Sequence, residues 1–254
     1  MASKNSSGVV ETIKTLVYAI VIALFIRTFF YEPFSIPSAS MVPTLLIGDY
    51  LFVSKFSYGY SRYSLPFGLP LIPGPGRVFF RSPQRGDVVV FKQPAHPSVD
   101  FIKRIVGLPG DRLQMKEGVL NVNSAPVALQ RLSDYFYSAS YFDSPGCRTS
   151  NYPRYLETLP GGKQHVIIKN CGPPQFDNTP VFTVPPDHYF MMGDNRDDSS
   201  DSRDPISGVG YVPSQNLVGR AEFIFYSTDG YAAWWEAWKW PFTIRYGRLL
   251  SAIH

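Results

Sequence analysis

Hydrophobic residues form one long run near the N-terminus, followed by many short runs separated by polar and turn-forming residues. The long run is LVYAIVIALFI, residues 16–26, and the apolar character extends over the 19 residues 13–31. A helix of this length spans about 28 Å, close to the ~30 Å hydrocarbon thickness of a bilayer. The pattern therefore predicts one transmembrane helix over residues 13–31, with residues 1–12 as a short tail and residues 32–254 as a folded domain.

Basic residues around this segment favour a cytoplasmic N-terminus. Lys4 and Lys14 lie at its beginning, although Arg27 near its other end weakens the asymmetry. The alternative is a cleaved signal peptide, with the small residues 38–40 marking the cut. Such a cut would follow two prolines and a glutamate, a long and stiff connection. We expect a single-pass anchor, with the domain on the outer face of the membrane.

The short apolar runs downstream predict a mainly β fold. With 20 glycines and 23 prolines, the chain favours short strands and turns over long helices. A turn is expected at residues 108–111 and a hairpin around Glu117-Gly118. Residues from about 130 to 180 are polar, aromatic and turn-rich, which predicts an inserted smaller subdomain of strands and loops. We expect an antiparallel β-sheet with strands inside residues 50–60, 86–94, 101–107, 188–195 and 219–227.

Composition excludes several classes of protein. Charged residues make up 17% and hydrophobic residues 44%, so the chain is not disordered. The net charge of +4 suits an anionic lipid surface, but the basic residues are scattered, which argues against nucleic-acid binding. The four histidines show no metal-ligand spacing, so neither a metal site nor a cofactor is expected.

Cys147 and Cys171 both fall in the part of the chain expected outside the membrane. An even pair of cysteines in an oxidising compartment suggests a disulfide. Two unpaired, buried thiols are the alternative interpretation.

Two apolar stretches are candidates for contact with lipid. One is residues 65–74, and the other is residues 234–242, which hold all four tryptophans. Tryptophan prefers the membrane–water interface, where its ring is apolar and its N–H stays hydrated. Packing in the core, or a cap at the end of the chain, explains the tryptophan cluster equally well.

Ser40 and Lys103 are candidates for a catalytic pair. A serine hydroxyl is a weak nucleophile near neutral pH and needs a base, and no histidine stands in a recognisable relation to Ser40. Strand alternation sends Phe101, Lys103 and Ile105 to one face. An apolar environment there disfavours the ammonium form and lowers the pKa of Lys103. A surface lysine is the alternative interpretation of this residue taken alone.

Several blocks, in this order, resemble the bacterial type I signal peptidases, a family of membrane-anchored Ser–Lys proteases. The blocks are the apolar anchor, PSASMVPTLLIGDYLFVSKFSYG, GDVVVF, FIKRIVGLPGD and GDNRDDSSDSR. The resemblance covers nearly the whole chain. It implies a serine endopeptidase of the bacterial inner membrane, acting without a cofactor. Its partners would be membrane lipid and translocated precursors, from which it removes signal peptides after Ala-x-Ala-like sites.

The resemblance also implies roles for individual residues. Ser40 would be the nucleophile and Lys103 the general base. The Ser40 N–H and the Ser38 hydroxyl would form the oxyanion hole, while Ser199 would hydrogen-bond the lysine amine and orient it. Shallow pockets for small side chains would be lined by Phe34, Ile36, Pro37 and Ile102. A structural role near the site is expected for Gly193, Asp194, Arg196, Asp201 and Arg203, although the charged residues among these, with Asp197, are also typical of a solvated, salt-bridged loop.

Some features depart from the family pattern. Many members carry two membrane segments and a larger second domain. Ala39 stands where glycine is common, and Asp198 where asparagine is often found. No catalytic group is lost, which argues against an inactive homologue. A related protease dedicated to one pilin or conjugation-type precursor, or a non-enzymatic membrane-anchored binding module, remains an alternative.

Overall fold

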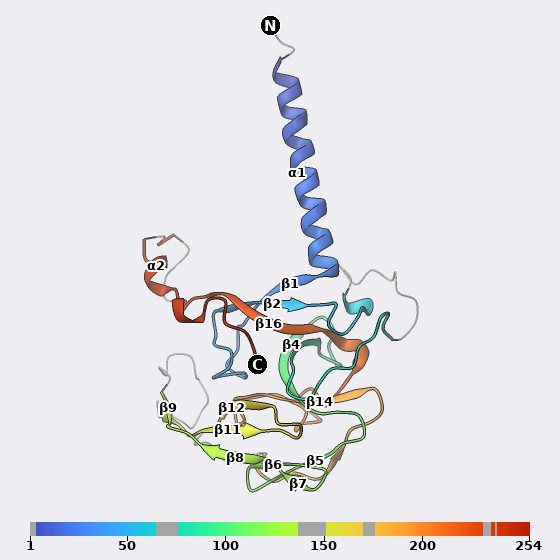
Figure 1. Ribbon diagram of the computed structural model, residues 1–254, viewed down its shortest axis with the longest axis vertical. Coiled ribbons are helices and arrows are strands. Elements are labelled where there is room, and N and C mark those ends of the chain that lie inside the picture. The colour runs from blue at the N-terminus through green and yellow to red at the C-terminus, as the bar shows by residue number, and fades with distance from the viewer. Residues whose placement is uncertain (1–3, 65–75, 137–150, 170–175, 231–234, 237) are drawn as a thin grey trace.

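A single long helix extends away from a β-rich body in the computed structural model (Figure 1). The structure describes residues 4–64, 76–136, 151–169, 176–230, 235–236 and 238–254. Helix α1 (Lys4–Phe29) includes the segment Gly8–Phe29, which is long and apolar enough to cross a membrane. The side chains of this segment are exposed except for that of Thr28, at the end that meets the body. The helix begins at Lys4, within the predicted tail of residues 1–12. It ends at Phe29, before the predicted end at residue 31, because Tyr31 already pairs with Ser54 in the sheet.

The body is built on a seven-stranded antiparallel sheet. Its strand order is β1-β2-β16-β3-β4-β14-β15. Pro33 lies in the edge strand β1, where its missing N–H costs no central ladder bond. The predicted antiparallel fold is confirmed, with strands β1 (Tyr31–Ser35), β2 (Asp49–Ser54), β3 (Val88–Lys92), β4 (Asp100–Gly107), β14 (His188–Met192), β15 (Tyr211–Pro213) and β16 (Leu217–Ser227).

Between β4 and β14 the chain leaves this sheet and forms a second lobe, at the end of the body farthest from α1 (Figure 1). The hairpin expected around Glu117-Gly118 is present, and both residues have positive φ, 49° and 74°. The predicted inserted subdomain of residues 130–180 falls within this excursion. The lobe contains β5 (Arg112–Lys116), β6 (Val119–Val122), β7 (Ala125–Pro126), β8 (Ala128–Arg131), β9 (Tyr135–Phe136), β10 (Asn151–Tyr152), β11 (Arg154–Thr158), β12 (Gln164–Ile168) and β13 (Phe182–Thr183).

Strand β3 is buried on both of its faces, which fixes the position of its neighbour β4. Val88 and Val90 pack in one hydrophobic cluster with Met41 and Leu45, whereas Val89 and Phe91 belong to another. Because successive side chains point to opposite faces of a sheet, burial on both sides explains the unbroken apolar sequence VVVF. The strand that carries Lys103 therefore pairs with a well-anchored strand of the sheet.

Short helices cap the connections of the main sheet: η1 (Arg62–Ser64), η4 (Ser214–Asn216), α2 (Trp240–Thr243) and η5 (Tyr246–Arg248). Helix α2 lies on the side of the body from which α1 extends (Figure 1). Three neighbouring tryptophans, Trp235, Trp238 and Trp240, are 63%, 68% and 45% exposed. Core packing is therefore wrong for these three. Residues 65–74, Trp234 and the cysteines Cys147 and Cys171 lie outside the described residues, so the disulfide stays a prediction.

Candidate active site

Ser40 lies in the loop between β1 and β2, and apolar neighbours hold this loop in place. Met41, Val42 and Leu45 are fully buried, and Ser40 itself is only 8% exposed. The loop is also tied to the residues after β14, because Asn195 N donates to the Ser40 carbonyl oxygen over 3.1 Å and Asn195 Nδ2 donates to that of Ala39 over 3.3 Å. These bonds fix the peptide planes on both sides of the Ser40 side chain.

Lys103 reaches this serine from strand β4. Its Nζ donates to Ser40 Oγ over 2.7 Å and to the Ile102 carbonyl oxygen over 3.0 Å. The side chain is 3% exposed and lies 5.3 Å from the centre of the Phe101 ring. The structure thus brings together two candidate residues that are 63 positions apart in the chain.

The surroundings of Lys103 change its acidity. Burial disfavours the ammonium and lowers its pKa to about 8, against the opposing effect of Asp201, Asp194 and Asp198, whose charges raise it. At this pKa a substantial fraction of the amine is neutral near physiological pH. A neutral amine 2.7 Å from a hydroxyl can accept its proton, so the pair can act as nucleophile and base.

The two other serines implicated by the resemblance lie close to this pair. Ser38 Oγ is 3.5 Å from Ser40 Oγ, longer than a normal O–H···O hydrogen bond. Ser199 is packed against Gly193, where an added Cβ would lie 2.3 Å from Ser199 Oγ and 2.5 Å from the Ser40 carbonyl oxygen. Gly193 therefore permits a close approach that any larger residue would block.

The expected hydrogen bond between Ser199 and the lysine amine is not formed. Ser199 Oγ is buried and has no hydrogen-bond partner among the described residues. The amine of Lys103 instead directs its hydrogens to Ser40 and to the Ile102 carbonyl. In this structure the orientation of the lysine therefore depends on its own strand.

Ser40 and Lys103 lie in the wall of a cleft of about 900 Å³. One side is formed by the end of β1 and the loop that follows it, and another by the beginning of β4. Ser38 and Ser199 line the same cleft, with the acidic residues Asp197 and Asp198 beside Ser199. All four residues expected to form apolar pockets also line it: Phe34, Ile36, Pro37 and Ile102.

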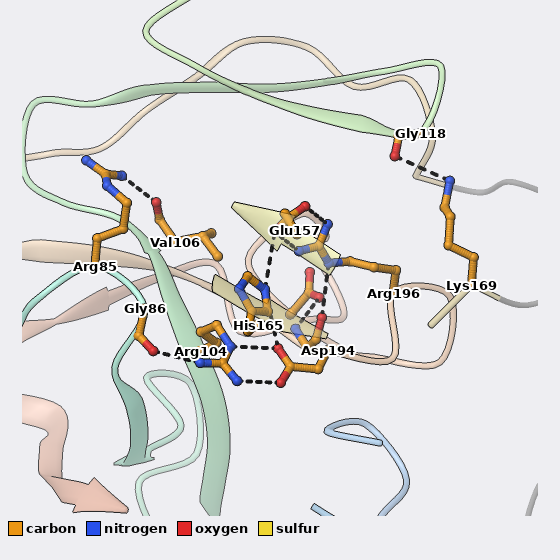
Figure 2. Close-up of polar contacts among 12 residues, drawn as sticks. Arg85, Gly86, Arg104, Val106, Gly118, Glu157, His165, Lys169, Asp194 and Arg196 are labelled. Carbon is orange, nitrogen blue, oxygen red and sulfur yellow. Dashed lines mark hydrogen bonds and ion pairs between the residues drawn. The ribbon is translucent and has the colours of Figure 1, made fainter. Parts of the chain in front are cut away.

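A buried cluster of charged residues supports the loop that follows β14 (Figure 2). Arg104 donates to both oxygens of Asp194, over 2.8 and 2.7 Å, and Thr44 Oγ1 donates to the same carboxylate over 2.5 Å. Arg196 forms a two-pronged pair with Glu157, with one bond of 2.7 Å. Asp194 and Arg196 are each 1% exposed. The alternative of a solvated loop is therefore wrong for these residues.

A second buried pair lies on the other side of Gly193. Arg203 donates to Asp201 over 2.8 Å, and Asp201 also accepts from the Gly193 N–H over 3.1 Å. Both charged side chains are 1% exposed. The three ion pairs, Arg104–Asp194, Arg196–Glu157 and Arg203–Asp201, hold the segment that packs against Ser40.

Several members of this cluster of charged residues could not be predicted from the sequence. Glu157 and His165 are paired across β11 and β12, and His165 Nε2 lies 3.2 Å from Glu157 Oε2. No spacing motif signals this contact, since it depends on the register of two strands. Arg104 has a clearer signal, because it follows Lys103 in an otherwise apolar strand.

The charge states in this cluster follow from its contacts. Burial raises the pKa of the Glu157 carboxyl, but Arg196 and His165 outweigh this effect and hold the pKa at about 2. Burial lowers the pKa of His165, with a smaller contribution in the same direction from Arg104. The Glu157 carboxylate is thus ionised and His165 neutral near pH 7. The part of the chain that the structure describes contains no group of three or more His, Cys, Asp or Glu residues placed so that it could hold a metal ion.

The chain is similar in sequence to known signal peptidases. The family described as "Signal peptidase, peptidase S26" matches residues 9–226. The chain is 40% identical to a "Signal peptidase I" of Rickettsia typhi over 245 residues, covering 92% of this chain and 86% of the relative. It is 39% identical to a "Signal peptidase I" of Rickettsia prowazekii over 238 residues, covering 91% and 85%.

A structural similarity also exists, but it is weak. The crystal structure of a signal peptidase I from Enterococcus faecalis V583 is 26% identical and covers 55% of this chain and 97% of its own. The TM-score of this match is 0.31.

Proposed function

The chain belongs to the peptidase S26 family of signal peptidases, and on this premise we propose that it cuts precursor proteins with a Ser40–Lys103 catalytic dyad. The observation that carries the proposal is the 2.7 Å contact between Lys103 Nζ and Ser40 Oγ inside a cleft large enough for a peptide. Membership of the family makes the protein a serine peptidase.

The first step is a proton transfer. Neutral Lys103 takes the proton of Ser40 Oγ as this oxygen attacks the scissile carbonyl carbon. With a pKa of about 8, about one lysine in ten is neutral at pH 7. With an ordinary pKa of 10.5 the fraction would be about one in three thousand. Burial of Lys103 therefore raises the concentration of the reactive form by a factor of about 300.

The developing negative charge on the carbonyl oxygen needs hydrogen-bond donors. The Ser40 N–H and the Ser38 hydroxyl are the donors that we assign. Asn195 Nδ2 donates to the Ala39 carbonyl oxygen and so fixes the peptide that carries the Ser40 N–H, and Ser38 Oγ lies 3.5 Å from Ser40 Oγ. When the intermediate collapses, the Lys103 ammonium returns the proton to the leaving amine. Water then hydrolyses the Ser40 ester, with Lys103 again as the base.

The cleft walls account for substrate choice. Apolar side chains line the part of the cleft beside the dyad, and shallow apolar pockets of this kind favour small side chains such as alanine. We therefore propose cleavage after Ala-x-Ala-like sites. The residues assigned to these pockets are Phe34, Ile36, Pro37 and Ile102.

The anchor helix supplies the location. Ser40 is ten positions after Phe30 in the chain, so the nucleophile lies at most about 33–36 Å of extended chain from the membrane surface. Lys4 and Lys14 favour a cytoplasmic N-terminus. We propose a single-pass protein of the bacterial inner membrane, with its catalytic domain on the periplasmic face, acting on translocated precursors that carry signal peptides.

Cleavage of purified secretory precursors by the detergent-solubilised protein tests this function. Wild type, Ser40→Ala and Lys103→Ala are compared, with Lys116→Ala as a control because Lys116 is an exposed lysine outside the cleft. The proposal predicts a new N-terminus immediately after Ala-x-Ala, lost in the first two variants and kept in the control. Failure of folded wild type to cut several unrelated precursors would indicate a dedicated substrate or a binding role.

A further inference from the structure

The anchor helix is joined to the catalytic cleft by a short and ordered junction. Helix α1 ends at Phe29, strand β1 begins at Tyr31, and residues from Pro33 onward line the cleft. Only three residues therefore separate the end of the membrane helix from the cleft wall. The angle between α1 and β1 consequently decides which way the cleft faces relative to the bilayer.

An ion-pair network fixes this angle. Glu32 in β1 accepts from Arg27 of α1 over 2.8 Å and from Lys55 after β2 over 2.9 Å. The Lys55 side chain is 3% exposed, and its Nζ also donates to the Ser64 carbonyl oxygen over 2.7 Å. Burial raises the pKa of Glu32, but the charges and hydrogen bonds of Lys55 and Arg27 outweigh this and keep the carboxylate ionised.

Backbone and aromatic contacts complete the junction. Tyr60 Oη donates to the Phe29 carbonyl oxygen over 2.6 Å, and Lys55 N donates to that of Phe30 over 2.9 Å. The first of these carbonyls ends the helix and the second lies in the link to β1. Tyr31 packs edge-on against Phe56, with ring centres 5.5 Å apart. The link between helix and strand is therefore held by the segment 55–60, which follows β2.

The proposed reaction makes no use of Glu32 or Lys55. Burying the Lys55 ammonium nevertheless costs desolvation free energy, which its pairing with Glu32 must offset. A precursor whose signal peptide lies in the bilayer presents its cleavage site at a restricted height and direction. A short peptide in solution approaches the cleft from any direction. A fixed junction therefore benefits the first kind of substrate only, through better orientation of the reacting groups.

We propose that Glu32 and Lys55 are positioning residues that aim the cleft at membrane-embedded precursors. This inference rests on the proposed function, and it concerns the substrate's location rather than the bond that is cut. Glu32 is the central residue, since it joins the helix through Arg27 to the body through Lys55.

The test compares two substrates of the full-length enzyme reconstituted in lipid vesicles. One is a precursor with its signal peptide inserted in the same bilayer, and the other is a soluble peptide that spans the same cleavage site. Glu32→Gln should lower kcat/KM for the embedded precursor about tenfold and leave the value for the soluble peptide within a factor of two. Tyr60→Phe, which removes one hydroxyl, should show the same selectivity with a smaller loss.

Asp177→Asn is the matched control, because Asp177 forms a comparable partly buried pair with Lys169 over 3.0 Å in the second lobe. Asp177→Asn should leave the ratio of the two kcat/KM values unchanged. An equal loss on both substrates in Glu32→Gln would indicate a merely structural role and overturn the proposal, as would no loss on either. If Glu32→Gln fails to fold, the test rests on Tyr60→Phe. A ratio of the two activities in Tyr60→Phe equal to that of wild type then refutes the inference.

Ser40→Ala, assayed in parallel, separates this inference from the function on which it rests. Retention of cleavage in that variant would refute the Ser40 dyad while leaving the ratio of the two activities informative about the junction. Loss of cleavage in Ser40→Ala, together with an unchanged ratio in the junction variants, would refute the positioning role alone.

Discussion

Raising the pH from 7 to 9 should increase kcat/KM for a soluble peptide about tenfold, and a further increase in pH should have little effect. Lys103 acts in its neutral form, and burial lowers its pKa to about 8. The neutral fraction is then about 0.09 at pH 7, about 0.5 at pH 8 and about 0.9 at pH 9. Activity is therefore lost as the pH falls through 8, where the amine gains its proton.

An unburied lysine would give a different profile. With a pKa of 10.5, kcat/KM would rise about a hundredfold between pH 7 and pH 9, with no levelling. The assay is cleavage of the peptide by detergent-solubilised enzyme from pH 6 to pH 10. A tenfold rise for every pH unit up to pH 10, or a flat profile, would refute the argument that burial tunes this lysine.

Asp198→Asn tests the electrostatic part of the same reasoning. The Asp198 carboxylate favours the ammonium form and raises the pKa of Lys103, so removing its charge should move the midpoint of the profile to lower pH. Asp134, which pairs with Arg131 and does not line the cleft, offers a control: Asp134→Asn should leave the midpoint in place. A midpoint that stays fixed or moves upward in Asp198→Asn would contradict the prediction.

Further predictions concern the packing and the buried charges around the dyad. Gly193→Ala should abolish peptide cleavage, because its Cβ would lie 2.5 Å from the Ser40 carbonyl oxygen; wild-type activity would show that this approach is unimportant. Glu157→Gln should lower the free energy of unfolding by about 3–5 kcal/mol in guanidinium titrations, since Arg196 is left as an unpaired buried charge; a change below about 1 kcal/mol would contradict this. In the wild type, the ionised Glu157 carboxylate contributes about 3 kcal/mol to the free energy of unfolding above pH 4.5, the ordinary pKa of a glutamate. This contribution should be lost as the pH falls from 4.5 to 2. An unfolding midpoint independent of pH in this range would argue against the ionised pair.

Local patterns in the sequence were sufficient for the anchor and for the main strands. The uninterrupted apolar run predicts α1 because only a membrane or a large core accommodates it. The sequence VVVF predicts a strand buried on both faces, and β3 is such a strand. The end of α1 was less predictable, because it is set by the pairing of β1 with β2 and not by hydrophobicity.

Only part of the site could be predicted from the sequence. Alternation suggested an apolar environment for Lys103, but the family resemblance, not the spacing, joined it to Ser40 across 63 residues. The hydrogen bond expected between Ser199 and the Lys103 amine is absent; Lys103 Nζ donates to Ser40 Oγ and to the Ile102 carbonyl oxygen. Side-chain hydrogen bonds of this kind depend on rotamers that a sequence pattern does not specify.

The buried charges were the least predictable feature. Glu157 and His165 meet through the register of β11 and β12, while Arg196 arrives from a loop 39 residues farther along the chain than Glu157. The pair of Glu32 and Lys55 likewise depends on the alignment of β1 with β2. Charged residues in such positions look like ordinary surface residues until the strands are paired.

The most direct test of the Ser40–Lys103 dyad is covalent labelling by a peptide phosphonate with an Ala-x-Ala sequence, which forms a bond to a nucleophilic serine. The modified residue is located by mass spectrometry in wild type and in Lys103→Ala across a range of pH. We predict a single adduct on Ser40. In wild type its rate of formation rises with pH along a titration curve with a midpoint near pH 8, and in Lys103→Ala the adduct is nearly absent. An adduct on another residue, or equal labelling of Ser40 in both proteins, would contradict the account.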